Sequence, residues 1–236
     1  MPMSPRLLRP KASSGFDPRT IAGLAVWFDA SKSSSITLNA GNVSQWDDLS
    51  GNGRNATQAT AGNQPSYSTA ALNGKNVVVA QDSSRVLKTA AFAAALPQTV
   101  FVVGSSTGNQ QGFFQRGGVN GVHSLLRDSG SFRARRGSGN EATISASDGY
   151  KVFTCVYTKF LARIFVGNTQ GTDNTTNVTG TGADTTDTRT LALFNLDSIY
   201  GLVGGIAEFL YYNAELSASD QDKVRSYLSK KWNVAL

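Results

Sequence analysis

Short apolar runs that alternate with turn-forming segments are the feature that most constrains the fold of this chain. Gly, Asn and Ser separate the runs, and each run has the length of a strand and is rich in β-branched or aromatic residues. The runs span residues 24–28, 77–80, 100–103, 152–157, 161–166, 191–194 and 206–212. Several of them are apolar on both faces, as expected for strands that lie between two layers. The pattern therefore predicts an all-β protein.

The amino-acid composition supports this prediction. Glu occurs only at positions 141, 208 and 215, whereas Gly occurs 24 times among many Ser, Thr and Asn residues. Strong helix formers are scarce and turn formers are abundant, which excludes a mostly helical protein, a long coiled coil and a collagen-like chain. With 236 residues the chain is long enough to bury a substantial core, and no apolar run approaches the about 20 residues that span a bilayer.

The C-terminal end carries a clear helix signal. Ser217 begins a pattern similar to a capping box, with Asp220 in the place of the usual Glu. Acidic residues follow at the expected helix start and lysines at its end, where each sign of charge is stabilised by the helix dipole. The pattern predicts a helix over residues 218–232. Its apolar stripe, which we expect to pack on the sheets, consists of Val224, Tyr227, Leu228 and Trp232.

Residues 1–20 differ in composition from the rest of the chain. They hold four of the six prolines, and four basic residues against one acidic residue. Proline removes backbone donors and disfavours helix, so we expect an extended arm, followed by one sandwich domain over residues 21–236. The apolar residues of the arm favour docking on a partner over a solvated tail. The residues expected to dock are Arg6, Leu7, Leu8, Arg9, Lys11, Phe16 and Arg19.

Metal and thiol chemistry find little support in the sequence. The chain has one His and one Cys, so His/Cys metal clusters are excluded, and Cys155 lies in an apolar run that favours a buried role. Calcium needs only oxygen ligands, and Asp47, Asp48 and Asn52 offer them in a Gly-rich turn. The favoured alternative is that the aspartates cap this turn. We expect no cofactor, with calcium as the open alternative.

Hydrolytic chemistry is also weakly signalled. Residues 104–108 read G-x-S-x-G, but no amphipathic helix follows, so a polar turn is favoured over a nucleophile elbow. Glycosidases use two carboxylates, and the best pair in this chain would combine Glu208 with an Asp of a loop. Glu208 lies in an apolar strand, where burial would raise its pKa. A paired structural acid is the more common role for such a residue.

A second basic cluster lies between residues 116 and 136. It contains Arg116, Arg127, Arg133, Arg135 and Arg136, with Asp128 as the acidic residue among them. None of the usual nucleic-acid-binding modules is visible around it. We therefore favour a solvated or partner-facing surface and do not expect nucleic-acid binding.

Two sequence signatures bracket the predicted sandwich domain. The first comprises residues 24–30 (LAVWFDA), 43–53 (VSQWDDLSGNG), 56–58 and 64–65, and the second comprises residues 205–213 (GIAEFLYYN), 216–217 and the helix up to 232. Together they resemble the first strands and the closing strand and helix of LamG-like domains of the concanavalin A-like jelly-roll family. The resemblance implies a two-sheet antiparallel jelly-roll sandwich with one C-terminal helix, the fold class that the strand pattern also favours.

The resemblance also raises expectations about function. LamG-like domains that follow a Pro/Arg-rich leader look like those of tailed-phage virion proteins and bacterial surface proteins. We expect a non-catalytic virion structural protein, a capsid decoration or tail accessory component that is made in the host cytoplasm and displayed on the virion surface. Its expected partners are the major capsid or tail protein lattice, host-surface glycans and copies of itself in a trimer. We do not expect it to bind a membrane.

Two alternative functions stay open at this point. The first is a free carbohydrate-binding module of a bacterial surface protein, and the second, with the least support, is a glycoside hydrolase. Sugar binding commonly uses aromatic rings that are exposed on the surface. The aromatic residues that we expect to contact glycans are Tyr67, Phe113, Phe114, Phe132 and Tyr150.

Overall fold

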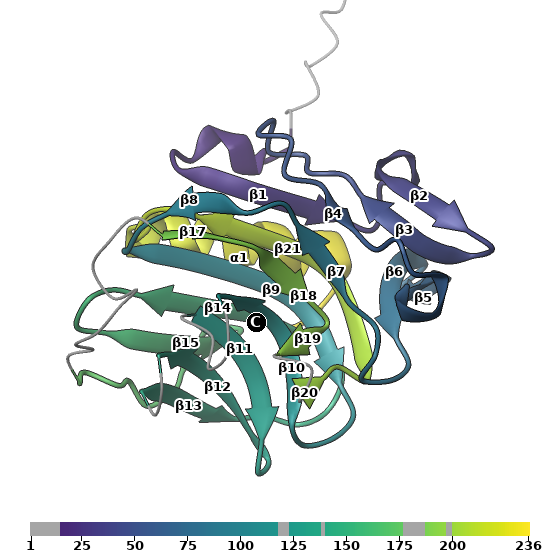
Figure 1. The fold of residues 1–236 in the computed structure, drawn as a ribbon. Helices are drawn as coiled ribbons and strands as arrows, with labels where there is room; N and C mark the ends of the chain where they lie inside the picture. Colours follow the sequence, from purple (N-terminus) through teal and green to yellow (C-terminus); the bar gives the residue numbers. More distant parts are fainter. Residues whose placement is uncertain (1–14, 118–122, 138–139, 177–186, 197–199) are drawn as a thin grey trace, which may run out of the picture.

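Two antiparallel β-sheets packed face to face form the body of the structure (Figure 1). The computed structural model describes residues 15–117, 123–137, 140–176, 187–196 and 200–236. The first sheet, which we call the back sheet, contains in spatial order β1 (Leu24–Asp29), β21 (Gly204–Tyr212), β9 (Gln98–Ser106), β14 (Lys151–Tyr157), β15 (Ala162–Val166) and β16 (Thr169–Gln170).

The second sheet, which we call the front sheet, is the wider of the two. It contains in spatial order β13 (Glu141–Ser145), β12 (Ser131–Arg136), β11 (His123–Asp128), β10 (Gln111–Arg116), β18 (Leu191–Leu193), β7 (Leu87–Thr89), β4 (Ala56–Thr57), β3 (Asn42–Trp46) and β2 (Ile36–Asn39). At one edge, β5 (Ser66–Leu72) pairs with β3 while β6 (Lys75–Ala80) pairs with β21, and the β5–β6 hairpin thus joins the two sheets.

Short elements complete the described structure. Two small strand pairs are β8 (Phe92–Ala94) with β17 (Asp187–Arg189) and β19 (Asn195–Leu196) with β20 (Tyr200–Gly201). Three 3-10 helices span Pro18–Thr20, Ser33–Ser35 and Ala61–Asn63. The sequence Val166-Gly167-Asn168, which predicts a hairpin turn, forms the tight connection between β15 and β16, in which Gly167 has a positive φ of 57°. Residues 168–190 are nearly devoid of large apolar side chains, which predicts a long loop or a solvent-facing ribbon, and residues 177–186 of this segment lie outside the described ranges.

The hydrophobic core lies between the two sheets. Phe153 of the back sheet contacts Phe113 at 5.3 Å and Phe132 at 4.7 Å between ring centroids, and Phe209 contacts Phe114 at 5.3 Å. All five rings are fully buried. Burying one such side chain stabilises a fold by roughly 1.5–3 kcal/mol, so this aromatic seam is a main source of the attraction between the sheets.

The α-helix α1 (Ala218–Trp232) has the predicted bounds and packs on the outer face of the back sheet, against β9 and β14. Ser217 caps its N-terminus by accepting a hydrogen bond from the Asp220 N–H at 3.1 Å, and Asn233 ends it in a left-handed conformation. The predicted fold class, an all-β two-sheet sandwich with a C-terminal helix, is confirmed. No helix within the described ranges is long and apolar enough to cross a bilayer.

All seven predicted apolar runs are strands, and the strands that the prediction missed are polar on one face. In β12, for example, Phe132 and Ala134 point into the core, whereas Arg133 and Arg135 point outward. Such strands bury only every second residue, so they contain no continuous apolar run. The outer face of the front sheet is built from these half-polar strands, and no α-helix of the described residues covers it.

The predicted arm is only partly within the described residues. Arg6, Leu7, Leu8, Arg9 and Lys11 lie outside them. The remaining two docking candidates contact the sandwich itself, because Phe16 packs against the ring of Tyr227 at 5.3 Å and Arg19 lies over the ring of Trp27 at 5.9 Å. Arg19 also pairs with Asp17 and keeps 59% of its side chain exposed, so docking of the arm on a partner stays a prediction.

Candidate functional site

One residue of each front-sheet strand belongs to a row that crosses the outer face of the sheet. Residues directly opposite each other in an antiparallel pair share a face, so the registers define the row strand by strand. In spatial order the row consists of Thr37, Gln45, Thr57, Lys88, Ala192, Gln115, Ser124, Arg135 and Glu141. We call it the transverse row. With about 4.8 Å between strands, it extends over about 38 Å.

The transverse row is polar and accessible over most of its length. Thr37, Thr57 and Lys88 are exposed, and Gln45 is half-buried. These residues alternate along their strands with core residues, which is why one face of each strand is free to be polar. Between Thr37 and Ser124 the row offers hydroxyl, amide and ammonium groups, and no carboxylate. It is therefore rich in groups that donate or accept neutral hydrogen bonds.

Two hollows lie along the transverse row. The first, at the end formed by β2, β3 and β4, is lined by side chains of which most carry hydroxyl or amide groups. Its lining residues are Thr37, Asn39, Ser44, Gln45, Thr57, Gln58, Ala59 and Gln64. Asn39 and Gln64 are hydrogen-bonded to each other at 3.3 Å, and Gln45 donates to Asp47 at 2.7 Å. The amides are thus held in fixed orientations by their neighbours.

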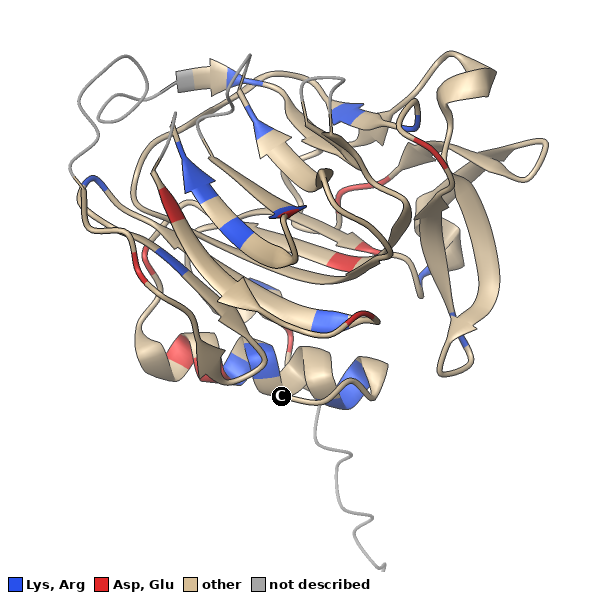
Figure 2. Ribbon diagram, turned by 90° about the horizontal axis from the view of Figure 1, so that it is seen from below, with Lys and Arg blue, Asp and Glu red and all other residues tan. Residues whose placement is uncertain are grey.

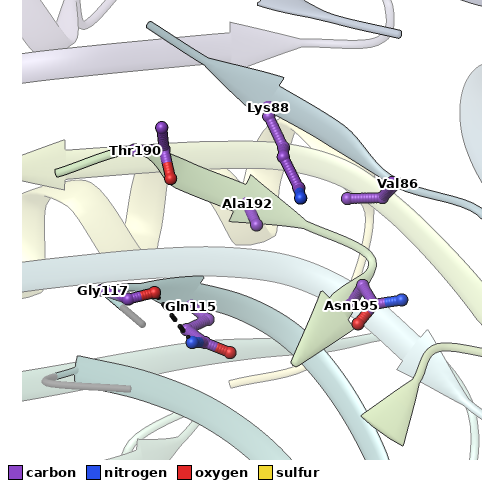
Figure 3. Close-up of a pocket in the computed structure, with 7 residues that line it drawn as sticks. All are labelled: Val86, Lys88, Gln115, Gly117, Thr190, Ala192 and Asn195. Atoms are coloured by element: carbon purple, nitrogen blue, oxygen red, sulfur yellow. Dashed lines mark hydrogen bonds between the residues drawn. The ribbon is translucent and has the colours of Figure 1, made fainter. Parts of the chain in front are cut away.

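The second hollow lies at the centre of the row, where β7, β18 and β10 meet. It has a volume of about 90 Å³, which is enough for several water molecules or a small ligand group. Its lining residues are Val86, Lys88, Gln115, Gly117, Thr190, Ala192 and Asn195. Figure 3 shows these residues, with the Lys88 side chain extending toward β18. Gln115 donates to the Gly117 carbonyl at 2.9 Å.

The β19–β20 pair forms a wall beside the central hollow. A side chain at Gly112 of β10 would place its Cβ 2.7 Å from the Cβ of Leu196 and 2.9 Å from the carbonyl oxygen of Tyr200. Only glycine allows such a close approach between the pair and the sheet. Asn195, at the start of β19, is held by a hydrogen bond from its amide to the Ser83 carbonyl at 2.8 Å. The wall of the hollow is therefore rigidly built.

Two carboxylates lie near the far end of the transverse row. Glu141 accepts from Arg133 at 2.7 Å and from Arg135 at 2.6 Å, and Asp128 lies 3.4 Å from the other terminal nitrogen of Arg133. The hydrogen bond to Glu141 raises the pKa of the Arg133 guanidinium. The row therefore ends on the β13 side in an ion-pair network in which two arginines and two carboxylates largely balance each other's charge.

The aromatic residues predicted to contact glycans do not lie on this face. Phe113, Phe114 and Phe132 are fully buried in the core, so their prediction as glycan-stacking residues is wrong. Their strands bury every large side chain that points toward the back sheet. Tyr67 and Tyr150 are half-buried against the core, and neither lines the two hollows.

The calcium candidates form the turn that the sequence favoured as their alternative role. The Asp48 carboxylate accepts from the backbone N–H groups of Trp27 at 2.9 Å, Ser50 at 2.9 Å and Arg54 at 3.0 Å. Asn52 donates its amide to the carbonyls of residues 24 and 25, and Asp47 accepts from a glutamine side chain. No group of three or more His, Cys, Asp or Glu side chains among the described residues is placed to hold a metal ion.

We expect Asp48→Ala to lower the free energy of unfolding by about 2 kcal/mol, because it leaves backbone donors without their acceptor. Urea denaturation of the variant and the parent chain measures this loss. Addition of calcium or of EDTA is expected to leave the midpoints of both proteins unchanged. A calcium-dependent midpoint that is lost in Asp48→Ala would instead identify a calcium site at this turn.

The second basic cluster is dispersed by the fold. Arg116 is buried over the ring of Phe92 at 5.2 Å, and Arg127 pairs with Asp148 at 2.6 Å. Arg136 is also buried and donates to backbone carbonyls. Figure 2 shows acidic and basic residues interspersed over the strands and α1. The expectation of one solvated or partner-facing basic surface is therefore wrong, because the side chains of adjacent strand positions point to opposite faces.

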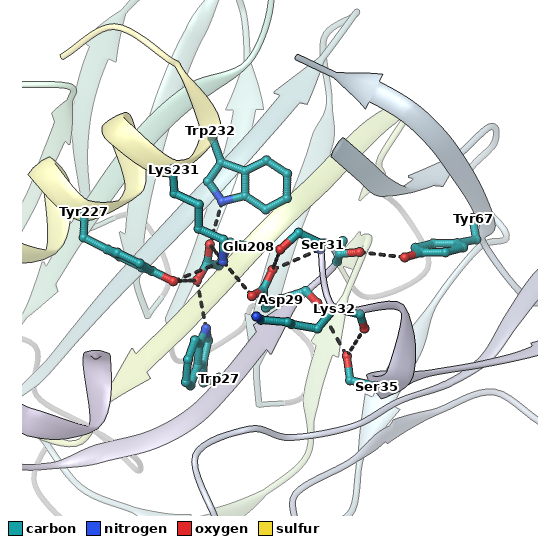
Figure 4. Close-up of polar contacts among 11 residues, drawn as sticks. Trp27, Asp29, Ser31, Lys32, Ser35, Tyr67, Glu208, Tyr227, Lys231 and Trp232 are labelled. Atoms are coloured by element: carbon teal, nitrogen blue, oxygen red, sulfur yellow. Dashed lines mark hydrogen bonds and ion pairs between the residues drawn. The ribbon is translucent and has the colours of Figure 1, made fainter. Parts of the chain in front are cut away.

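Glu208, the sequence candidate for a hydrolytic acid, is enclosed under α1 (Figure 4). Its carboxylate accepts from Trp27 Nε1 at 2.8 Å, Tyr227 Oη at 2.8 Å, Lys231 Nζ at 2.7 Å and Trp232 Nε1 at 2.6 Å. Burial raises the pKa of Glu208, and the Lys231 ammonium opposes that rise. With four donors around a fully buried carboxylate, Glu208 acts as the structural acid that joins α1 to the sandwich.

Comparison with known proteins adds a likeness of fold. No family model and no curated protein sequence matches the chain. A sialidase from Trypanosoma rangeli in complex with the inhibitor DANA shares the fold with a TM-score of 0.61 and 13% identity, over 91% of this chain and 34% of the sialidase. An arabinofuranosidase complexed with arabinofuranosyl-α-1,2-xylobiose shares it with a TM-score of 0.63 and 14% identity, over 81% of this chain and 51% of the arabinofuranosidase.

These comparisons contradict the expectation of a non-catalytic virion structural protein. The sialidase and the arabinofuranosidase are glycoside hydrolases, as is a third structure that shares the fold, a GH54 α-L-arabinofuranosidase soaked with a cyclic sulfate inhibitor, at 14% identity and a TM-score of 0.61. The same likeness contradicts the expectation that the chain has no enzymatic role. At this identity the likeness establishes the fold alone. The chain spans about a third of the sialidase and about half of the arabinofuranosidases.

Proposed function

We propose that the outer face of the front sheet binds carbohydrate, as the recognition surface of a carbohydrate-active protein. The observation that carries this proposal is the transverse row with its two hollows. Sugar hydroxyls both donate and accept hydrogen bonds, and amide and hydroxyl side chains match them in both respects. Gln45, Thr37 and Thr57 present such groups side by side on three neighbouring strands.

The direction of the row supports an extended ligand. A glycan that lay along the row would cross the strands and meet a new side chain about every 4.8 Å. Ser124 is fully buried in the row, and its hydroxyl has no hydrogen-bond partner among the described residues. A ligand on the surface would therefore contact the row at its accessible members, which include Thr37, Gln45, Thr57 and Lys88.

The fold likeness supports the same class of ligand. The matched sialidase and arabinofuranosidase structures carry a sialidase inhibitor and an arabinofuranosyl-xylobiose, respectively. Because this chain spans only part of those enzymes, we propose the binding of a glycan here rather than either of their reactions. Asp128 and Glu141, at the β13 end of the row, are the pair of carboxylates at which a hydrolytic activity would be sought first.

Removal of row side chains is expected to weaken glycan binding by about three- to tenfold per residue, the effect of losing one or two hydrogen bonds. The variants are Gln45→Ala, which removes the amide group, and Thr57→Val, which replaces the hydroxyl group with a methyl group. Both residues lie on the outer face, so the core is unchanged. Affinity electrophoresis in gels that contain defined polysaccharides measures the dissociation constants. The same mixtures are assayed for new reducing ends, which would reveal hydrolysis.

A matched control is Thr169→Val on the edge strand β16, where the threonine is exposed and belongs to the back sheet, not to the sheet that carries the row. We expect it to bind like the parent chain. If Gln45→Ala and Thr57→Val also retained the parent affinity for every polysaccharide that the chain binds, the front sheet would not be the binding face.

A further inference from the structure

Lys88 places a positive charge at the centre of the transverse row. It lies on β7 between Thr57 and Ala192, and its side chain lines the central hollow together with Gln115 and Asn195 (Figure 3). None of the described residues that line this hollow is acidic. Among the described residues, no carboxylate forms an ion pair with Lys88.

Other basic residues of the chain have different surroundings. Lys231 is held between Asp29 and Glu208, Lys223 pairs with Asp220, and the arginines near the β13 end of the row are bonded to Glu141. Those charges are neutralised within the protein. Among the described residues of the transverse row, Lys88 is the exception: its side chain is exposed and borders the central hollow.

We propose that the glycan bound by the front sheet carries an anionic group, a carboxylate or a sulfate, and that Lys88 binds this group in the central hollow. This inference rests on the proposed function. An ammonium group is a compact point charge that binds carboxylate and sulfate oxygens through charge-assisted hydrogen bonds. The hollow, at about 90 Å³, has room for such a group beside the row, while the hydroxyl and amide residues around it hold the sugar rings.

The rest of the site fits an anionic ligand. Between Thr37 and Ser124 the row has no carboxylate that would repel it, and the chain as a whole carries a net charge of +6. The net charge favours the approach of acidic polymers from any direction. A contact at Lys88, in contrast, makes the affinity depend on that one side chain. An experiment can therefore separate the contribution of Lys88 from that of the net charge by comparing variants.

The experiment compares charged and uncharged polymers that share one backbone. Dextran sulfate against dextran tests a sulfate, and polygalacturonate against its carboxyl-reduced form tests a carboxylate. We expect Lys88→Gln to weaken binding of at least one charged polymer by about three- to tenfold, to leave binding of its neutral counterpart unchanged, and to lower the salt dependence of the affinity. Lys88→Arg, which keeps the charge, is expected to retain most of the affinity.

Lys230→Gln on α1 is the matched control, because it removes the same charge from an exposed lysine on the other side of the sandwich. If it weakened binding as much as Lys88→Gln, the attraction would come from net charge and the inference would be wrong. Equal affinity of the parent chain for charged and neutral polymers would overturn it as well.

Failure of this inference and failure of the proposed function give different results. If Gln45→Ala and Thr57→Val weaken glycan binding while Lys88→Gln does not, the proposal of an anionic ligand is wrong and the proposal of the front sheet as the binding face is supported. If all three variants bind like the parent chain, both the ligand class and the binding face are wrong.

Discussion

Replacement of Glu208 by alanine is expected to lower the free energy of unfolding by about 3–5 kcal/mol, the range for breaking a buried ion pair. The change removes the acceptor of four donors, including the buried N–H groups of Trp27 and Trp232, and leaves Lys231 with Asp29 as its remaining carboxylate. Because three of these donors belong to α1, the helix loses its main polar attachment to the sandwich. Urea denaturation followed by tryptophan fluorescence measures the loss.

Glu208→Gln separates the role of the charge from that of the shape. The amide keeps one acceptor oxygen but turns an NH₂ group toward donors, so we expect a loss that is large but smaller than that of alanine. We expect both variants to be less stable than the parent chain. The fraction of each variant that stays folded is expected to retain glycan binding. A fully stable Glu208→Ala chain would contradict the structural role that the hydrogen bonds assign to this residue.

Acidification is expected to destabilise the protein through His123. Burial, together with the charges of Arg116 and Arg136, lowers the pKa of His123 from 6.5 to about 3. The native state therefore keeps the imidazole neutral, whereas the unfolded chain protonates it below pH 6.5. The stability that this difference provides is complete above pH 6.5 and is lost as the pH falls toward 3. At pH 4 the loss amounts to about 3 kcal/mol.

His123→Phe isolates this contribution from that of the acidic residues. Phenylalanine keeps a ring beside Tyr157, which lies 5.0 Å from the imidazole, and it does not titrate. We expect the two proteins to differ little at pH 8 and the variant to be the more stable by about 3 kcal/mol at pH 4. Denaturation midpoints measured at several pH values test this, and a stability difference that did not change with pH would show that His123 has an ordinary pKa.

The strands and the helix were predictable because their signals are local. Each of the seven apolar runs became a strand, and the cap at Ser217 with its apolar stripe located α1 at residues 218–232. The role of Asp48 was also predictable, since an aspartate in a Gly-rich turn bonds backbone groups close to it in sequence. The helix cap and the contacts of Asp48 with Ser50 and Arg54 join residues close in sequence, so the local pattern contains them. The contact of Asp48 with Trp27, 21 residues away, was decided by the fold.

The burial of Phe113, Phe114 and Phe132 was not predictable in this way. They lie in strands with polar neighbours, and their direction depends on which face of each strand meets the back sheet. A shift of register by one residue would have exposed Phe132, and the adjacent Phe113 and Phe114 both contact rings of the back sheet because the register of β10 shifts between Gly112 and Phe114. The burial of Arg116 and Arg136 was equally unpredictable, because arginine is usually a surface residue and its direction in a strand depends on the same register.

The sequence by itself determined that this chain forms short strands, a sandwich and a closing helix, because strand length, turn residues and helix caps act over a few residues. Only the tertiary structure decided where a ligand would bind. Thr57, Lys88 and Gln115 lie far apart in the chain and become neighbours on one face through the order and register of β4, β7, β18 and β10. That order depends on long-range strand pairing and on the packing of the core, neither of which leaves a local pattern in the sequence.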